Sequence, residues 1–169
     1  MKAMKKILAL ALAGVMALAL LTGCGTGGSA SHKSIAEAMA DYDRGVENNP
    51  HITCTSSAKL DAKLQELAAN PGFEAIVKAV YTDTSPTIPA GVLPTNKVVY
   101  LYCGKYDKDA GKQAINLNAH SACINTGSPA LADERQIGLI TTSFTDKNTH
   151  EKVKVRFAVV VSKIPTATP

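Results

Sequence analysis

The chain has 169 residues, of which 46% are hydrophobic and 19% charged, and it contains no tryptophan. Its 18 basic residues outnumber 14 acidic ones, but three lysines lie within the first six residues, so positions 24–169 carry a net charge of only +1. This balance argues against a nucleic-acid-binding protein, which would present a basic surface. The lack of tryptophan argues against the aromatic platforms that bind carbohydrates and quaternary ammonium ions.

The N-terminal segment has the three-part layout of a secretory signal. Lysines at positions 2, 5 and 6 precede an uninterrupted apolar run from Ile7 to Leu21, after which come Thr22, Gly23 and Cys24. The apolar run has 15 residues, whereas a helix that spans a membrane needs about 20. Positions 1–23 are therefore predicted to be a signal peptide that is removed.

Leu21, Thr22, Gly23 and Cys24 resemble the lipobox of bacterial lipoproteins. The resemblance implies that the Cys24 sulfur carries a diacylglyceryl thioether and that a signal peptidase cuts just before it. It also implies a location at the extracytoplasmic face of the cell membrane, or at the outer membrane if the host has two membranes. The alternative is an ordinary secretory peptide with an incidental cysteine. Positions 24–33 are predicted to be a flexible tether, because glycine and serine dominate there.

Three helices are predicted in the first part of a single domain at positions 34–164. Ser34 and Glu37 form a capping box for the first helix, and Ser56 or Ser57 caps the second, which ends near Asn70. Each helix has apolar residues at helical spacing. These are Ile35, Met39, Tyr42 and Val46 in the first, Leu60, Leu64 and Leu67 in the second, and Phe73, Ile76, Val77 and Val80 in the third.

The second part of the domain is predicted to form a sheet. A proline-rich connection at 82–95 is either a functional loop or a passive crossover. Beyond it the apolar period changes to two, which predicts one hairpin from 97–105 and 113–120 and another from 136–145 and 151–164. Positions 165–169 are predicted to be a disordered tail. The predicted fold class is α+β, with three N-terminal helices packed on one face of a four-stranded, mainly antiparallel sheet.

One face of the predicted strand at 113–120 is a candidate contact surface. Strict alternation would turn Ile115, Leu117 and Ala119 toward the core. The outward residues would then be Asn116, Asn118 and His120. Their polar side chains could contact a ligand or a protein.

Three cysteines remain in the domain besides Cys24, namely Cys54, Cys103 and Cys123. Two thiols of an exported domain can form a disulfide, and the register of the first predicted hairpin favours Cys54 with Cys123. The alternative is that the thiols are free and buried.

Two His-x-x-Cys pairs, His51 with Cys54 and His120 with Cys123, could together supply four zinc ligands. A cysteine nucleophile could also be assembled from Cys123 or Cys103 beside His120. The sequence contains neither the nucleophile elbow of serine hydrolases nor the His-Glu-x-x-His helix of zinc peptidases.

These observations favour a non-enzymatic, lipid-anchored module of the cell envelope that binds a small ligand or a protein and needs no cofactor. Its expected contact regions are the loop at 82–95 and the face with Asn116, Asn118 and His120. The alternative is a small envelope hydrolase or a zinc-binding protein that uses His51, His120 and Cys123. A purely structural spacer is the third possibility.

Overall fold

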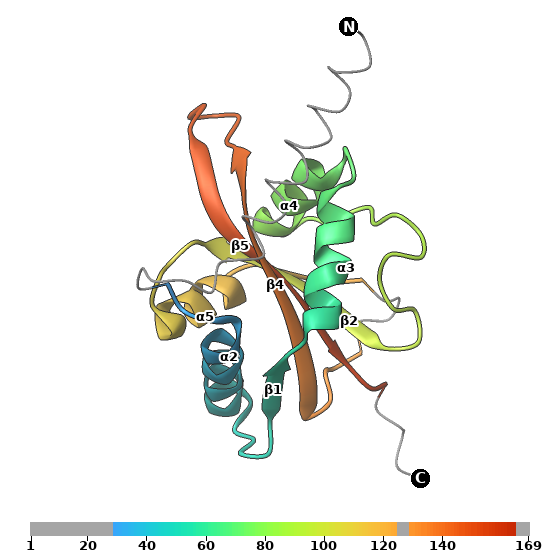
Figure 1. Cartoon of the computed structure of the whole chain (residues 1–169). Coiled ribbons are helices and arrows are strands. Elements are labelled where there is room, and N and C mark those ends of the chain that lie inside the picture. The colour runs from blue at the N-terminus through green and yellow to red at the C-terminus, as the bar shows by residue number, and fades with distance from the viewer. Residues whose placement is uncertain (1–28, 125–128, 165–169) are drawn as a thin grey trace, which may run out of the picture.

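A computed structural model describes residues 29–124 and 129–164. The predicted signal peptide, Cys24 and the tail at 165–169 lie outside these ranges. The described elements, in chain order, are α2 (His32–Glu47), β1 (Thr53–Ser56), α3 (Ala58–Ala68), α4 (Phe73–Tyr81), β2 (Val98–Lys105), α5 (Ala110–Asn118), β3 (Ser121–Cys123), β4 (Glu134–Thr145) and β5 (Lys152–Ser162) (Figure 1).

The strands form one mixed sheet in the order β1-β4-β5-β2-β3. β1 runs parallel to β4, whereas the other neighbouring strands are antiparallel. The α+β class is therefore confirmed. Three details of the prediction are wrong: the described part of the chain has five strands instead of four and four helices instead of three, and the helices cover both faces of the sheet instead of one.

Helices cover both faces of the sheet, because each face of the central strand β5 is apolar. On one face, Phe157 and Val159 pack with α3 and α4, and on the other, Ala158 and Val160 pack with α2 and α5. All residues of the two cores lie between positions 30 and 161. Among the described residues, the segment from 25 onward therefore contains every member of both cores.

Two strand glycines let helices approach the sheet closely. A Cβ atom at Gly138 of β4 would lie 2.5 Å from the backbone carbon of Leu60 in α3. At Gly104 of β2, it would lie 2.2 Å from the backbone of Asn116 in α5. A larger residue at either position would push the helix away from its core.

The first three predicted helices and the second predicted hairpin are confirmed. The first helix begins earlier than its predicted capping box, because the Ser31 side chain accepts a hydrogen bond from the Ser34 amide and acts as the N-cap. Ser57, one of the two residues predicted to cap the second helix, is the N-cap of α3. Val46 is 69% exposed and does not belong to the core face of α2.

The predicted strand at 113–120 is wrong, because this segment forms helix α5. The Asp109 side chain accepts a hydrogen bond from the Lys112 amide and starts the helix. The buried residues Gln113, Ala114 and Leu117 then follow the helical spacing of three and four. The strand at 97–105, now β2, pairs with β5 and β3 instead.

The loop at 82–95 packs against the core formed with α3 and α4. Leu93 is buried, and Ile88 and Val92 are half-buried against the same cluster. Gly91 has a φ of 80°, which glycine adopts without strain. Part of this loop therefore contributes to the core.

Candidate functional site

None of the three domain cysteines forms a disulfide. Cys54 lies on β1 and Cys123 on β3, the opposite edge strands of the sheet. Four strand spacings separate them, roughly 19 Å, whereas the Cα atoms of a disulfide lie about 4.4 to 6.8 Å apart. The expected bond between Cys54 and Cys123 is therefore wrong.

The chemistry of two thiols is set by burial. Burial and, to a smaller extent, the nearby Asp43 carboxylate raise the pKa of Cys54 to about 12. Burial also raises the pKa of Cys103 to about 12. At neutral pH both are almost fully protonated, and a nucleophilic cysteine needs the thiolate. Neither thiol has the environment of a catalytic nucleophile.

The two His-x-x-Cys pairs do not meet. His51 is exposed beside β1, whereas His120 precedes β3 at the other edge of the sheet. His120 Nδ1 lies 3.1 Å from Asp83 Oδ2, and its ring stacks on Tyr81 with 4.7 Å between centroids. Within residues 29–124 and 129–164, no three His, Cys, Asp or Glu side chains are grouped so that they could hold a metal ion.

The asparagines of the predicted contact surface make hydrogen bonds within the domain. Asn116 Nδ2 donates to the Lys105 carbonyl at 3.0 Å, which ties α5 to β2. Asn118 Nδ2 donates to the Ala114 carbonyl at 3.0 Å and to the Met39 sulfur at 3.3 Å. The structure therefore separates these two side chains from His120, which lies beside α4.

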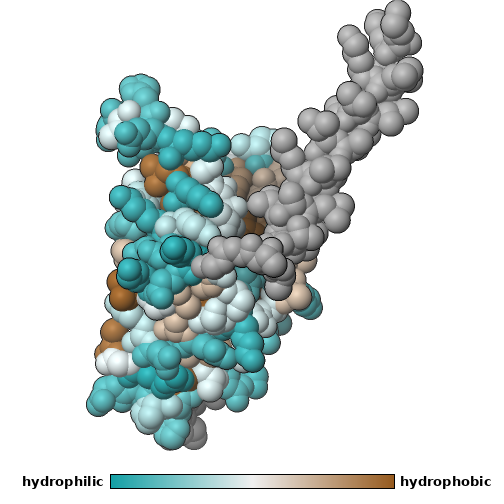
Figure 2. Space-filling model, turned by 60° about the vertical axis from the view of Figure 1, so that its left-hand side comes forward, coloured by the Kyte–Doolittle hydropathy of each residue, from teal (hydrophilic) through white to brown (hydrophobic). Residues whose placement is uncertain are grey.

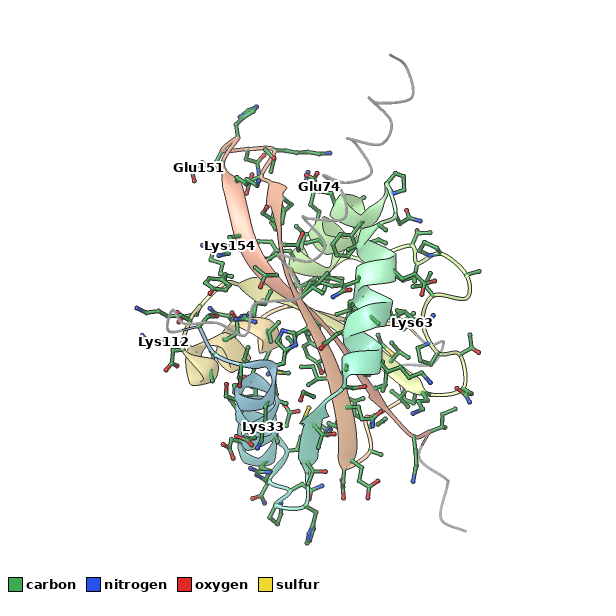
Figure 3. All side chains as sticks on the ribbon, viewed as in Figure 1. Lys33, Lys63, Glu74, Lys112, Glu151 and Lys154 are labelled. Atoms are coloured by element: carbon green, nitrogen blue, oxygen red, sulfur yellow. The ribbon has the colours of Figure 1, made fainter. Side chains whose placement is uncertain are left out.

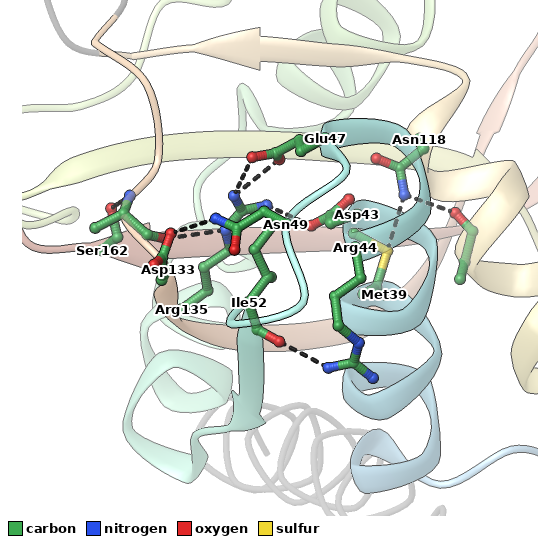
Figure 4. A network of polar contacts seen from close by, with 12 residues as sticks. Met39, Asp43, Arg44, Glu47, Asn49, Ile52, Asn118, Asp133, Arg135 and Ser162 are labelled. Atoms are coloured by element: carbon green, nitrogen blue, oxygen red, sulfur yellow. Dashed lines mark hydrogen bonds and ion pairs between the residues drawn. The ribbon is translucent and has the colours of Figure 1, made fainter.

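A buried ionic cluster joins the C-terminal half of α2 to the start of β4 (Figure 4). Arg135 donates from Nη1 to Asp43 Oδ2 at 2.5 Å and from Nη2 to both carboxylate oxygens of Glu47 at 2.8 and 2.9 Å. Its Nε donates to the Ala132 carbonyl at 3.1 Å. Desolvation raises the pKa of Asp43, although Arg135 opposes that change. The cluster fixes α2 relative to the edge of the sheet.

Next to this cluster, a groove of about 410 Å³ lies between α2 and β1. Small side chains of α2, Ala36 and Ala40, and the buried thiol of Cys54 form its apolar part. Charged side chains of α2, including Lys33, Glu37 and Arg44, also line the groove. Figure 1 shows α2 beside β1 on the side away from β4.

The groove exposes the open backbone edge of β1. The amides of Thr53 and Ser57 donate toward β4, to the Asp133 and Ile137 carbonyls, both at 2.9 Å. Successive residues of a strand alternate, so Cys54 and Ser56 direct their backbone groups to the groove side. The Ile52 carbonyl, which follows the same alternation, accepts a 2.7 Å hydrogen bond from Arg44 Nη1.

Sequence reasoning missed this site because β1 has four residues and no clear apolar period. One signal pointed to the ionic cluster: Asp43 lies four residues after Met39 on the core face of α2, where a charged side chain requires a partner. That partner, Arg135, is distant in sequence and could not be identified from spacing.

Comparison with protein-family models, curated proteins and solved structures finds no match to this chain. In the part of the chain that the structure describes, no helix has the length and apolar character needed to cross a membrane.

Proposed function

We propose that the protein is a lipid-anchored, extracytoplasmic binding module whose groove between α2 and β1 takes up an extended segment of an envelope protein. The observation that carries the proposal is the open edge of β1 with a helix alongside it. In strand addition, a peptide pairs with such an edge through main-chain hydrogen bonds, and a pocket selects its side chains. The anchor part of the proposal depends on the lipobox resemblance at Cys24.

The geometry of the groove determines what kind of segment would fit. Cys54 and Ser56 offer two amides and two carbonyls to a peptide of three or four residues. Ala36 and Ala40 leave space beside the strand for one apolar side chain of the peptide. Lys33 and Glu37, which are both exposed, would contact charged or polar flanking residues. We therefore expect a short, extended peptide with an apolar residue flanked by polar ones.

The groove is tested with Ser56→Pro, which removes the groove-side amide but keeps the amides that pair with β4. Edge strands tolerate proline where its missing N–H faces away from the sheet. The matched control is Ser56→Ala, which keeps the amide. A peptide selected from a random library should bind Ser56→Pro about tenfold more weakly, as expected for one lost hydrogen bond and a steric clash.

Hydrogen exchange provides an independent readout of strand addition. In the complex, the amides of Cys54 and Ser56 should exchange more slowly than in the free protein. The proposal fails if the selected peptides bind Ser56→Pro and Ser56→Ala equally well, or if they slow amide exchange elsewhere but not on β1.

The anchor is tested separately by metabolic labelling with palmitate. The natural chain should incorporate the label and appear in the membrane fraction, whereas Cys24→Ala should do neither. Label on Cys24→Ala, or a natural chain that is secreted unlabelled, would contradict the lipoprotein assignment and leave the test of the groove unaffected.

A further inference from the structure

The end of the β4–β5 hairpin has one face without acidic or large apolar residues. On β5 this face carries Lys152, Lys154 and Arg156, and the register places Thr145, Ser143 and Thr141 of β4 opposite them. These residues lie on the same side of the sheet as α2 and α5, but Lys152, Lys154 and Thr145 are exposed. We call these six residues the basic ribbon.

Further basic residues adjoin the basic ribbon. The ring of Tyr106 lies under Lys154, whose Nζ is 3.9 Å from the ring centroid, and Arg156 Cζ is 5.1 Å from the same centroid. Lys108 follows in the next loop, and Lys112 lies in the first turn of α5. Figure 3 shows Lys112 and Lys154 extending from the same side of the molecule, and Figure 2, in which this side comes forward, shows a mainly hydrophilic surface.

The positive charges here lack acidic partners among the described residues. Lys108, Lys112, Lys152, Lys154 and Arg156 form no ion pair there, whereas the cations beside α2's C-terminal half pair with carboxylates. Arg156 is only 4% exposed, and its Nε has no hydrogen-bond partner.

The neighbouring acids are engaged by the backbone. Asp107 Oδ1 accepts from the Asp109 amide and Asp109 Oδ1 from the Lys112 amide, both at 2.8 Å. Glu151 adjoins Lys152 at the hairpin turn. Across positions 106–112 and 145–156, six basic side chains accompany four acidic ones.

The chain enters the domain at this same place. Ser29 Oγ accepts hydrogen bonds from Arg156 Nη2 at 2.8 Å and from the Tyr106 hydroxyl at 2.9 Å, and the Ala30 amide donates to the Lys108 carbonyl. Ser29 follows Cys24 by five positions, a reach of at most about 18 Å. A lipid on Cys24 would hold the basic ribbon next to the bilayer surface.

We propose that the exposed lysines of the basic ribbon, with Lys108 and Lys112, lie against the anionic phospholipid headgroups of the membrane and so orient the anchored domain. This inference rests on the proposed lipidation of Cys24. Lysine ammonium groups and the ribbon hydroxyls can hydrogen-bond to phosphate oxygens. Each basic side chain at such a surface strengthens the contact roughly fivefold, and the effect decays within a Debye length. The groove between α2 and β1 would then keep a fixed orientation to the membrane.

The test attaches the segment 25–169 through an N-terminal histidine tag to vesicles with nickel-chelating lipids, so that it does not depend on lipidation. Amine acetylation followed by mass spectrometry measures the exposure of each lysine. With phosphatidylglycerol in the vesicles, Lys112, Lys152 and Lys154 should react about threefold more slowly than on phosphatidylcholine alone. Lys59, which is exposed on α3, should react at the same rate on both.

Variants separate charge from fold. Lys112→Gln/Lys154→Gln should lose the protection of Lys152, whereas the matched double variant Lys59→Gln/Lys63→Gln on α3 should keep it, with circular dichroism unchanged in both. High salt should abolish the protection. Equal acetylation rates on both vesicle types overturn the proposal. Protection by soluble polyglutamate but not by anionic vesicles also overturns it, in favour of an acidic protein partner.

Discussion

Replacing Arg135 by methionine tests whether the ionic cluster holds α2 on the sheet. The Arg135 side chain is 2% exposed and that of Asp43 is 10% exposed, so the variant leaves a buried carboxylate without its cation. Removing one partner of such a pair costs about 3–5 kcal/mol. Because the Glu47 side chain is 45% exposed and can be hydrated by water, we expect the lower limit, about 3 kcal/mol.

The loss should depend on pH. Arg135 lowers the pKa of Asp43, which burial raises, so its removal moves the folded-state pKa further above the unfolded value of 3.8. A folded-state pKa above the unfolded one means that stability falls as pH rises between the two values. The destabilisation should therefore be complete at pH 7 and smaller at pH 4.5, where the folded protein can protonate Asp43.

Urea unfolding followed by circular dichroism measures these differences in the free energy of unfolding. The matched variant Asp43→Val/Arg135→Met replaces the pair by apolar side chains and should recover most of the lost stability, because it leaves no buried charge unpaired. The reasoning is refuted if Arg135→Met costs less than about 1 kcal/mol, if its cost is the same at both pH values, or if the double variant is no more stable than the single one.

Two further predictions concern packing and thiols. Gly138→Ala should lower the free energy of unfolding by about 2 kcal/mol, because the added Cβ would overlap α3. Gly45→Ala, whose added Cβ would have nothing within 4 Å, should raise the free energy of unfolding by roughly 0.5 kcal/mol. Equal effects of the two variants in urea unfolding would contradict the close approach of α3 to the sheet. In the native protein at pH 8, Ellman's reagent should modify Cys54 and Cys103 far more slowly than the half-exposed Cys123. Urea should remove this difference in labelling rate. Fast labelling of Cys54 and Cys103 without urea would refute their burial.

The sequence predicted those elements whose pattern is local. The leucines of α3 and the valines of β5 repeat with a clear period, and Ser57 caps its helix through a contact three residues away. The segment at 113–120 was predicted as a strand because Ile115, Leu117 and Ala119 alternate with polar residues. The Asp109 cap and the spacing of Gln113 and Leu117, which indicate a helix, are present in the same sequence. Ile115, which alternation placed inside, is 57% exposed.

The candidate site could not be predicted because its parts are distant in sequence. β1 gains its structure from pairing with β4, about eighty positions later, and Arg135 meets Asp43 across a separation of 92 residues. The equal spacing of the two His-x-x-Cys pairs suggested that His51 and His120 bind one zinc ion, although they lie at opposite edges of the sheet. Local patterns locate helices and strands, but the order of strands in a sheet depends on contacts that no local pattern encodes.

The position of β5 determines when the sheet can assemble as the chain emerges. β5 lies between β4 and β2, and it is the last strand of the described chain, so the sheet has no centre until this segment is available. Before then, earlier segments can form only helices and two separate strand pairs, β1 with β4 and β2 with β3. A polypeptide that emerges N-terminus first from a channel would therefore lack its assembled sheet during nearly the whole passage.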